Sequence, residues 1–195
     1  MNPQRSQEER RPALRTDAEQ NRTRILEAAR SALVEAHDAS LNSIAKRAGV
    51  GPGTLYRHFP TREALMLAVY RQDVQALVEA APVLLASHPP FEALHLWFEH
   101  LASYGRVKHG LASAFSAATS ADLSGEYYSQ VVGALQLLLN AGQTSGQIRT
   151  DIEADEVLLL LGFLWRIEAV DWERRSRRLL TLVLDGLRSQ PISHV

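Results

Sequence analysis

The stretch Ser40-Leu-Asn-Ser-Ile-Ala-Lys-Arg-Ala-Gly49-Val-Gly-Pro-Gly-Thr-Leu-Tyr-Arg-His-Phe59-Pro60 decides the fold of this chain. Ser40 is a good N-cap for a short helix over 41–48, and Gly49 can take the positive φ that ends it. Pro52 suits the first turn of a second helix, because its missing N–H would have had no partner there. Pro60 then disfavours helical geometry at Phe59. The stretch therefore predicts two short helices joined by a tight glycine turn.

Small apolar residues can join these two helices in a core, which we expect to contain Ile44, Ala45, Ala48, Val50 and Leu55. Two helices joined in this way form a helix-turn-helix, whose second helix enters the major groove of DNA. The exposed face of that helix would present Thr54, Tyr56, Arg57 and His58. A threonine hydroxyl and an arginine guanidinium can reach base edges, and the polar ring tips of Tyr and His suit phosphates. Glycines at 51 and 53 would let the backbone approach the duplex closely.

The run over 40–65 resembles the signature of the tetracycline-repressor (TetR) family of transcriptional regulators. The family's pattern stands here as Ile44-Ala45, Ala48-Gly-Val50, Gly53-Thr-Leu-Tyr56, His58-Phe59 and Arg62-Glu-Ala-Leu65. By this resemblance, the family's DNA contacts correspond to Asn42, Gly53, Thr54, Tyr56, His58 and Arg62. Members often have Ser where Gly51 stands, and glycine is the weaker cap for the start of a helix.

The residues before this run form two predicted parts. Residues 1–16 are polar and arginine-rich, and we expect a flexible arm there. Its arginines could enter the minor groove or follow phosphates, and a tail without a role is the alternative. Thr16-Asp-Ala-Glu19 then matches a capping box, which predicts that the first helix starts at this point.

The rest of the chain predicts an all-α protein of about nine helices. After a fourth helix capped by Thr61, we expect helices near 90–108, 111–118, 124–145, 154–168 and 172–189, with Ser124 as a cap. A three-helix DNA-binding domain would span 17–62, and an effector-binding and dimerisation domain would span 63–195. Residues 1–70 carry 11 Lys and Arg against 8 Asp and Glu, whereas the remainder carries 10 against 14. This asymmetry suggests different partners for the two parts.

A homodimer is expected, because one helix-turn-helix reads few bases and specific sites usually need two reading helices. The segment 154–168 is apolar nearly all round, which indicates burial on several sides. The resemblance implies a four-helix interface built from this segment and 172–189 of each protomer. The predicted interface residues are Leu161, Trp165, Leu179, Leu182, Val183 and Gly186. Burial within a single subunit is the alternative.

The resemblance also implies a small-molecule pocket in the second domain. The predicted lining residues are Trp97, Phe98, Leu101, Tyr104, Phe115, Leu135 and Phe163, each of which could equally be plain core. Such a lining favours a hydrophobic or amphipathic effector. Binding of the effector would favour an arrangement whose reading helices no longer match successive major grooves, so a repressor would leave its palindromic operator.

Other classes of protein find little support. The chain has no cysteine, and it lacks the H-E-x-x-H and G-x-S-x-G motifs, so we expect no catalytic residues, metal or cofactor. The longest apolar run, 157–165, is too short to span a bilayer, and residues 1–15 do not resemble a secretory signal. We therefore expect a soluble, cytoplasmic protein without a membrane partner. A helical enzyme and a protein–protein adaptor remain the alternatives, although an adaptor would not explain Gly53-Thr-Leu-Tyr56.

Overall fold

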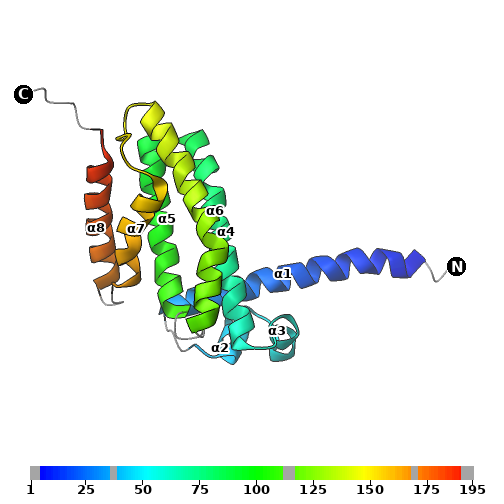
Figure 1. Cartoon of the computed structure of the whole chain (residues 1–195). Coiled ribbons are helices and arrows are strands. Elements are labelled where there is room, and N and C mark those ends of the chain that lie inside the picture. The colour runs from blue at the N-terminus through cyan, green and yellow to red at the C-terminus, as the bar shows by residue number, and fades with distance from the viewer. Residues whose placement is uncertain (1–4, 36–38, 112–116, 168–170, 190–195) are drawn as a thin grey trace, which may run out of the picture. The chain divides into compact units, whose positions relative to one another are not determined.

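The computed structural model describes residues 5–35, 39–111, 117–167 and 171–189, which form helices almost throughout. The elements are α1 (Arg5–Glu35), α2 (Leu41–Arg47), α3 (Pro52–His58), α4 (Arg62–Ser87), α5 (Pro90–Leu111), α6 (Ala117–Thr144), α7 (Ala154–Leu160), a 3₁₀-helix η1 (Leu161–Trp165) and α8 (Trp172–Leu187) (Figure 1). The described residues contain no β-strand, and one isolated antiparallel bridge pairs Ile148 with Arg188. The predicted all-α class is confirmed. None of the described helices is long and apolar enough to cross a membrane.

The chain divides into two compact units, and the boundary between Tyr70 and Arg71 falls inside α4. The first unit contains α1, α2, α3 and the beginning of α4. Its core gathers buried side chains from each of these helices, namely Ile25, Ala29, Ile44, Ala45, Leu55, Phe59, Leu65, Met66 and Val69. The small side chain of Ala45 fits the expected close crossing of α2 with its neighbours.

Local signals in the sequence set the ends of the short helices as predicted. Ser40 caps α2, since its Oγ accepts the N–H of Ser43 at 3.1 Å. Gly49 has a φ of 66° and turns the chain after α2. Pro52 occupies the first turn of α3, and the Thr61 Oγ1 accepts the N–H of Ala64 at 3.0 Å at the start of α4. The helix-turn-helix is thus confirmed as a local structure.

The second unit is built around α5, which packs against α6, η1 and α8. The buried residues are almost all apolar and include Leu94, Trp97, Phe98, Leu101, Leu135, Leu138, Leu139, Leu161, Leu164, Leu180 and Leu184. The one strongly polar atom of Trp97 is satisfied, because its indole N–H donates to the carbonyl oxygen of Leu77 at 2.8 Å. This unit therefore has a packed hydrophobic core in which the indole N–H of Trp97 is hydrogen-bonded.

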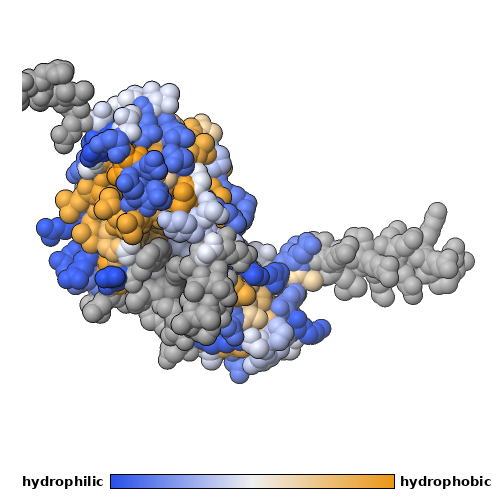
Figure 2. Space-filling model, in the orientation of Figure 1, coloured by the Kyte–Doolittle hydropathy of each residue, from blue (hydrophilic) through white to orange (hydrophobic). Residues whose placement is uncertain are grey.

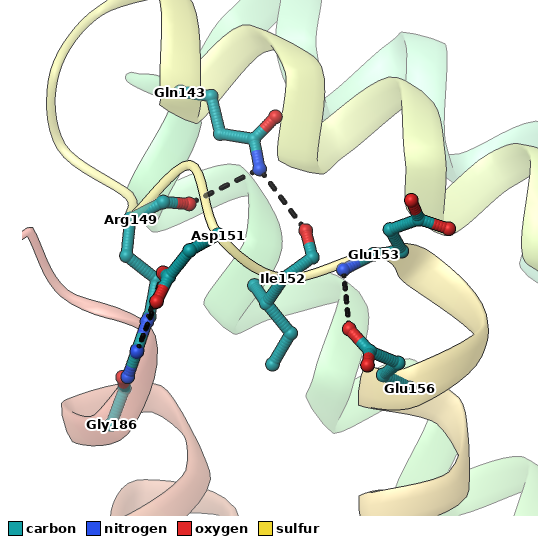
Figure 3. Close-up of polar contacts among 7 residues, drawn as sticks. All are labelled: Gln143, Arg149, Asp151, Ile152, Glu153, Glu156 and Gly186. Atoms are coloured by element: carbon teal, nitrogen blue, oxygen red, sulfur yellow. Dashed lines mark hydrogen bonds and ion pairs between the residues drawn. The ribbon is translucent and has the colours of Figure 1, made fainter.

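The loop between α6 and α7 is fixed by polar contacts (Figure 3). The Gln143 side chain donates to the carbonyl oxygens of Arg149 and Ile152, at 3.1 and 3.3 Å. The Arg149 guanidinium lies 2.6 Å from each carboxylate oxygen of Asp151, and it also donates to the carbonyl oxygen of Gly186 at 3.4 Å. These bonds hold the start of α7 beside the end of α8.

Two helix starts predicted from the sequence, at Thr16 and at Ser124, are wrong. The backbone is helical from Arg5, so Thr16 does not start α1. Good helix formers at 7–11 favour the helix, which continues through Pro12. Ser124 lies inside α6, which already begins at Ala117. The short helix expected over 111–118 falls largely on residues 112–116, outside the described residues.

The helix expected over 154–168 is also shorter than predicted. The α-helical part ends at Leu160, and η1 follows over Leu161–Trp165. Gly162 lies in η1, and glycine is a poor former of α-helix interiors. The change to a tighter helix thus falls where the sequence offers least support for a continuous α-helix.

Candidate nucleic-acid interface

The beginning of α3 is open to an approaching ligand. Gly51 occupies the N-cap position without a side-chain cap, as the sequence predicted. A Cβ atom added at Gly51 or at Gly53 would meet nothing within 4 Å. Free N–H groups at the first turn of a helix and its positive dipole end both favour a phosphate. The backbone here can therefore come close to a nucleic-acid strand.

One side of α3 is buried, and the other side is exposed. Leu55 and Phe59 are buried against the first unit, whereas 47% of the surface of Tyr56 is exposed. Arg57 and Gly53 are exposed as well, and Thr54 and His58 are half-buried. The ring of Tyr56 lies on the side of this seven-residue helix that the first unit leaves uncovered, so it is accessible to a partner.

Two further predicted contact residues lie on the flanking helices. Asn42, in the first turn of α2, is exposed. Arg62, at the start of α4, is half-buried, and its guanidinium donates to the carbonyl oxygen of Ala39, just before α2. Arg62 therefore ties the start of α4 to the start of α2, and this structural role was not predicted from the sequence.

The guanidinium of Arg57 is directed back along its own helix. Its Nε donates to the carbonyl oxygen of Gly53 at 3.1 Å, one turn earlier. The charged group is thus held toward the N-terminal end of α3, the end that enters a major groove in helix-turn-helix proteins.

Contacts from α1 support the helix-turn-helix and were missed from the sequence. The Arg22 guanidinium lies 4.8 Å from the centre of the Phe59 ring. Arg47 of α2 pairs with Glu35 at 2.5 Å, and this hydrogen bond lowers the pKa of the Glu35 carboxyl from its ordinary value. Both pairs join residues more than ten positions apart, so no local pattern could reveal them.

Comparison with known proteins agrees with this geometry. Residues 25–69 match the family model described as bacterial regulatory proteins, tetR family. Residues 89–189 match the model for the C-terminal domain of SbtR-like transcriptional regulators, which alone covers more than half of the chain. The chain belongs to the TetR family. It is therefore a helix-turn-helix transcriptional regulator that binds DNA, and not an enzyme.

Solved structures of other TetR regulators extend the likeness over most of the chain. A TetR transcriptional regulator from Streptomyces coelicolor is 41% identical and covers 87% of this chain and 99% of its own, with a TM-score of 0.78. A TetR regulatory protein from Mycobacterium vanbaalenii is 33% identical and covers 90% and 99%, with a TM-score of 0.71.

Curated relatives match over a shorter part. The transcriptional regulator UidR of Escherichia coli strain K12 is 39% identical over 84 residues, which span 42% of this chain and 40% of that protein. The match thus covers less than half of the relative's own length. TetR-family regulators bind DNA operators and function as dimers.

The residues predicted for a TetR dimer interface fall into different environments. Leu182 is 60% exposed, Gly186 is exposed, and Leu179 and Val183 are half-buried. Leu161 is completely buried within its own unit, so its side chain faces the core instead of a partner. The neighbouring Leu159 and Leu160 are exposed, and the sequence alone did not single them out. The side chain of Trp165 lies outside what the structure describes.

Most of the residues predicted to line an effector pocket are buried. Trp97, Phe98, Leu101, Tyr104 and Leu135 are buried, Phe163 is half-buried, and Phe115 lies outside the described residues. A cavity of about 340 Å³ lies between α5 and α8, and its lining residues are different from the predicted ones. Within the described residues, no cluster of His, Asp or Glu is arranged to hold a metal ion.

Proposed function

We propose that this chain represses transcription as a homodimer that binds a palindromic operator through α3 and leaves it when an effector binds to the second unit. The observation that carries this proposal is the exposed ring of Tyr56, on a short helix whose other side is buried and whose N-terminus is open.

The DNA contacts would come from α3 and its flanks. The hydroxyl of Thr54 and the exposed ring of Tyr56 would both contact the duplex, beside the open backbone at Gly53. Arg57 would read a base edge from the N-terminal end of the helix, because a guanidinium can donate two hydrogen bonds to guanine. His58 and Asn42 would contact phosphates, which position the helix without reading the sequence. Arg62 would act mainly by positioning α2 and α4 through Ala39.

A second copy would cover the exposed leucines of α7 and α8. We call Leu159, Leu160 and Leu182 the leucine face; they are 80%, 56% and 60% exposed. In Figure 2 hydrophobic surface gathers over the region where Figure 1 places α7 and α8. Exposing several large apolar side chains together is costly in water, and a contiguous patch of this kind marks an interface. A two-fold dimer matches a palindromic operator, because each half-site then receives the same α3.

The effector would be amphipathic and would bind at the cavity between α5 and α8. Its apolar lining comes from Ala102, Trp172 and Leu180, and its polar lining comes from His95, Glu99, Ser103, Glu173, Ser176 and Arg177. A volume of about 340 Å³ suits a small ligand. Since α8 also contributes to the leucine face, a ligand there could shift the dimer arrangement and so the spacing of the two α3 helices.

Selection of bound duplexes from random DNA tests the proposed function. We expect enrichment of a palindrome whose half-sites lie about one helical turn apart. Binding of that palindrome should weaken steeply with added salt, since phosphate contacts release counterions. An enriched site without two-fold symmetry would contradict the dimeric mode, and the absence of any enriched sequence would contradict specific DNA reading.

A further inference from the structure

Two rows of side chains line the cavity between α5 and α8, one row on each helix. The row on α5 contains His95, Glu99 and Ser103, and the row on α8 contains Trp172, Ser176 and Leu180. Both rows advance in steps of four residues, so each row follows one side of its helix. The middle residues of the two rows, Glu99 and Ser176, therefore lie near the middle of the cavity.

The two walls carry opposite charges that do not pair with each other. Glu99 supplies a carboxylate from α5, and Arg177 supplies a guanidinium from α8, next to Ser176. Among the described residues, Glu99 has one cationic partner, His95, at 3.9 Å, which is too long for a hydrogen bond. Arg177 makes no ion pair within the same part of the chain. Both charged groups are therefore available to a molecule that enters the cavity.

The α8 wall also offers a hydroxyl group that its own chain satisfies poorly. Ser176 is only 5% exposed, and its hydroxyl donates to the carbonyl oxygen of Glu173 at 3.4 Å. Hydrogen bonds of this kind are usually about 2.7–2.8 Å long. Buried polar groups normally have close partners, so this hydroxyl has room for a better one. Its neighbours along the row, Trp172 and Leu180, provide apolar surface.

We propose that this cavity binds a small zwitterion with an apolar body, the chemistry of an α-amino acid with an apolar or aromatic side chain. The ammonium group of the ligand pairs with Glu99. Its carboxylate pairs with Arg177, whose planar guanidinium can donate two parallel hydrogen bonds, and accepts a third from Ser176. The apolar body covers Trp172 and Leu180. One molecule thereby supplies a partner for both charged walls and for the buried hydroxyl.

A molecule with a single charge suits the cavity less well. An organic cation would place its charge near Arg177, and a carboxylic acid would place its charge near Glu99 and Glu173. Either ligand would also leave one wall without a partner, so selection depends on both charges together. This inference rests on the proposed function, because it names the chemical class of the effector for the same cavity.

Calorimetric titration of the full chain with three matched probes tests this class of ligand. The probes are L-phenylalanine, 2-phenylethylamine, which lacks the carboxylate, and 3-phenylpropionate, which lacks the ammonium group. We expect L-phenylalanine to bind about tenfold more tightly than either analogue, because each analogue loses one hydrogen-bonded charge pair. L-Leucine and L-tryptophan extend the test to smaller and larger apolar bodies. The amino acid that binds most tightly should also weaken binding to the operator.

Substitutions on the two walls test which group recognises which charge. Glu99→Gln and Arg177→Gln should each weaken the binding of L-phenylalanine by about tenfold. Glu99→Gln should also bind 3-phenylpropionate more tightly than the wild type does, and Arg177→Gln should do the same for 2-phenylethylamine. The matched control is Arg178→Gln, which removes an exposed arginine next to the cavity lining and should bind like the wild type. Circular dichroism establishes that each variant keeps its helices.

The assignment is wrong if none of the three amino acids binds at millimolar concentration. It is also wrong if a singly charged analogue binds as tightly as L-phenylalanine, or if Arg178→Gln loses as much affinity as Arg177→Gln. Operator binding by the ligand-free wild type is measured on the same samples. If that binding is intact, only the ligand class is overturned, whereas its absence would overturn the proposed function itself.

Discussion

The Nε of Arg57 donates a hydrogen bond to the carbonyl oxygen of Gly53, 3.1 Å away on the preceding turn of α3. The bond leaves the guanidinium near the open N-terminus of the helix, where no side chain at Gly51 or Gly53 stands in the way. In a helix-turn-helix regulator this is where base edges are read. The relationship makes Arg57 the residue most suited to select a base.

Replacing Arg57 should therefore change which sequences bind. We expect Arg57→Ala to reduce discrimination at one symmetric pair of operator positions by about 1–3 kcal/mol, the usual value of a bidentate contact with guanine. Arg57→Lys keeps the charge but loses the planar fork, so it should lose selectivity while keeping most of the salt dependence. Binding to duplexes substituted at each position measures this. If Arg57→Ala weakens the binding of all duplexes equally, Arg57 contacts a phosphate and not a base.

Replacing Arg62 should change the stability of the DNA-binding unit more than the choice of bases. Its guanidinium donates to the half-buried carbonyl oxygen of Ala39. Removing the guanidinium would leave that oxygen without this donor. Arg62→Met should lower the free energy of unfolding by about 1.5–3 kcal/mol, the range for hydrogen bonds that involve a charged group. Denaturant unfolding of the full chain checks the loss. A variant with unchanged stability but weaker DNA binding would instead make Arg62 a direct phosphate contact.

The glycine turn should respond to substitution according to backbone geometry. Gly49 has a φ of 66°, which a residue with a Cβ atom adopts at a cost of about 1–2 kcal/mol. We expect Gly49→Ala to destabilise the chain by that amount. Gly51, with a φ of −69°, is the matched control, and Gly51→Ser should stabilise α3 by a few tenths of a kcal/mol by adding a side-chain cap. Thermal unfolding measures both changes. Equal shifts in the Tm of Gly49→Ala and Gly51→Ser would show that backbone geometry is not the cause.

The contact between Arg149 and Asp151 predicts a dependence on acid pH. The hydrogen bond from Arg149 lowers the pKa of Asp151 from 3.8 to about 2 in the folded chain. A carboxyl with a lowered pKa stabilises the fold above its unfolded pKa, and this contribution disappears as the pH falls through the folded value. The Tm difference between the wild type and Asp151→Asn should therefore be largest near neutral pH and shrink between pH 3.8 and about 2. A difference independent of pH would show that the ion pair is not its source.

Short-range chemistry explains why the DNA-binding helices could be predicted so closely. Ser40, Gly49, Pro52 and Thr61 act within a few residues of their own positions, through a cap, a turn or a missing N–H. Such signals can be recognised from the sequence alone. The same holds for the weak cap at Gly51, which the structure confirms.

Features that depend on packing could not be predicted in this way. Leu159, Leu160 and Leu161 are identical in chemistry, yet only the third is buried, because it continues the row of Ala154 and Val157 that packs on the core. In a segment that is apolar nearly all round, the sequence does not show which row that is. Arg62 matched a contact position of the family, but its bond to Ala39 depends on how α4 meets the start of α2. Helix periodicity alone cannot supply either relationship.

If α3 reads DNA, replacing its exposed tyrosine must change the affinity for the palindrome selected from random DNA, and the decisive variant is Tyr56→Ala. Tyr128→Ala is the matched control, since Tyr128 on α6 is 50% exposed and Tyr56 is 47% exposed. We predict that Tyr56→Ala loses specific binding while it remains folded and dimeric, and that Tyr128→Ala binds like the wild type. Unchanged operator affinity in Tyr56→Ala would contradict the account.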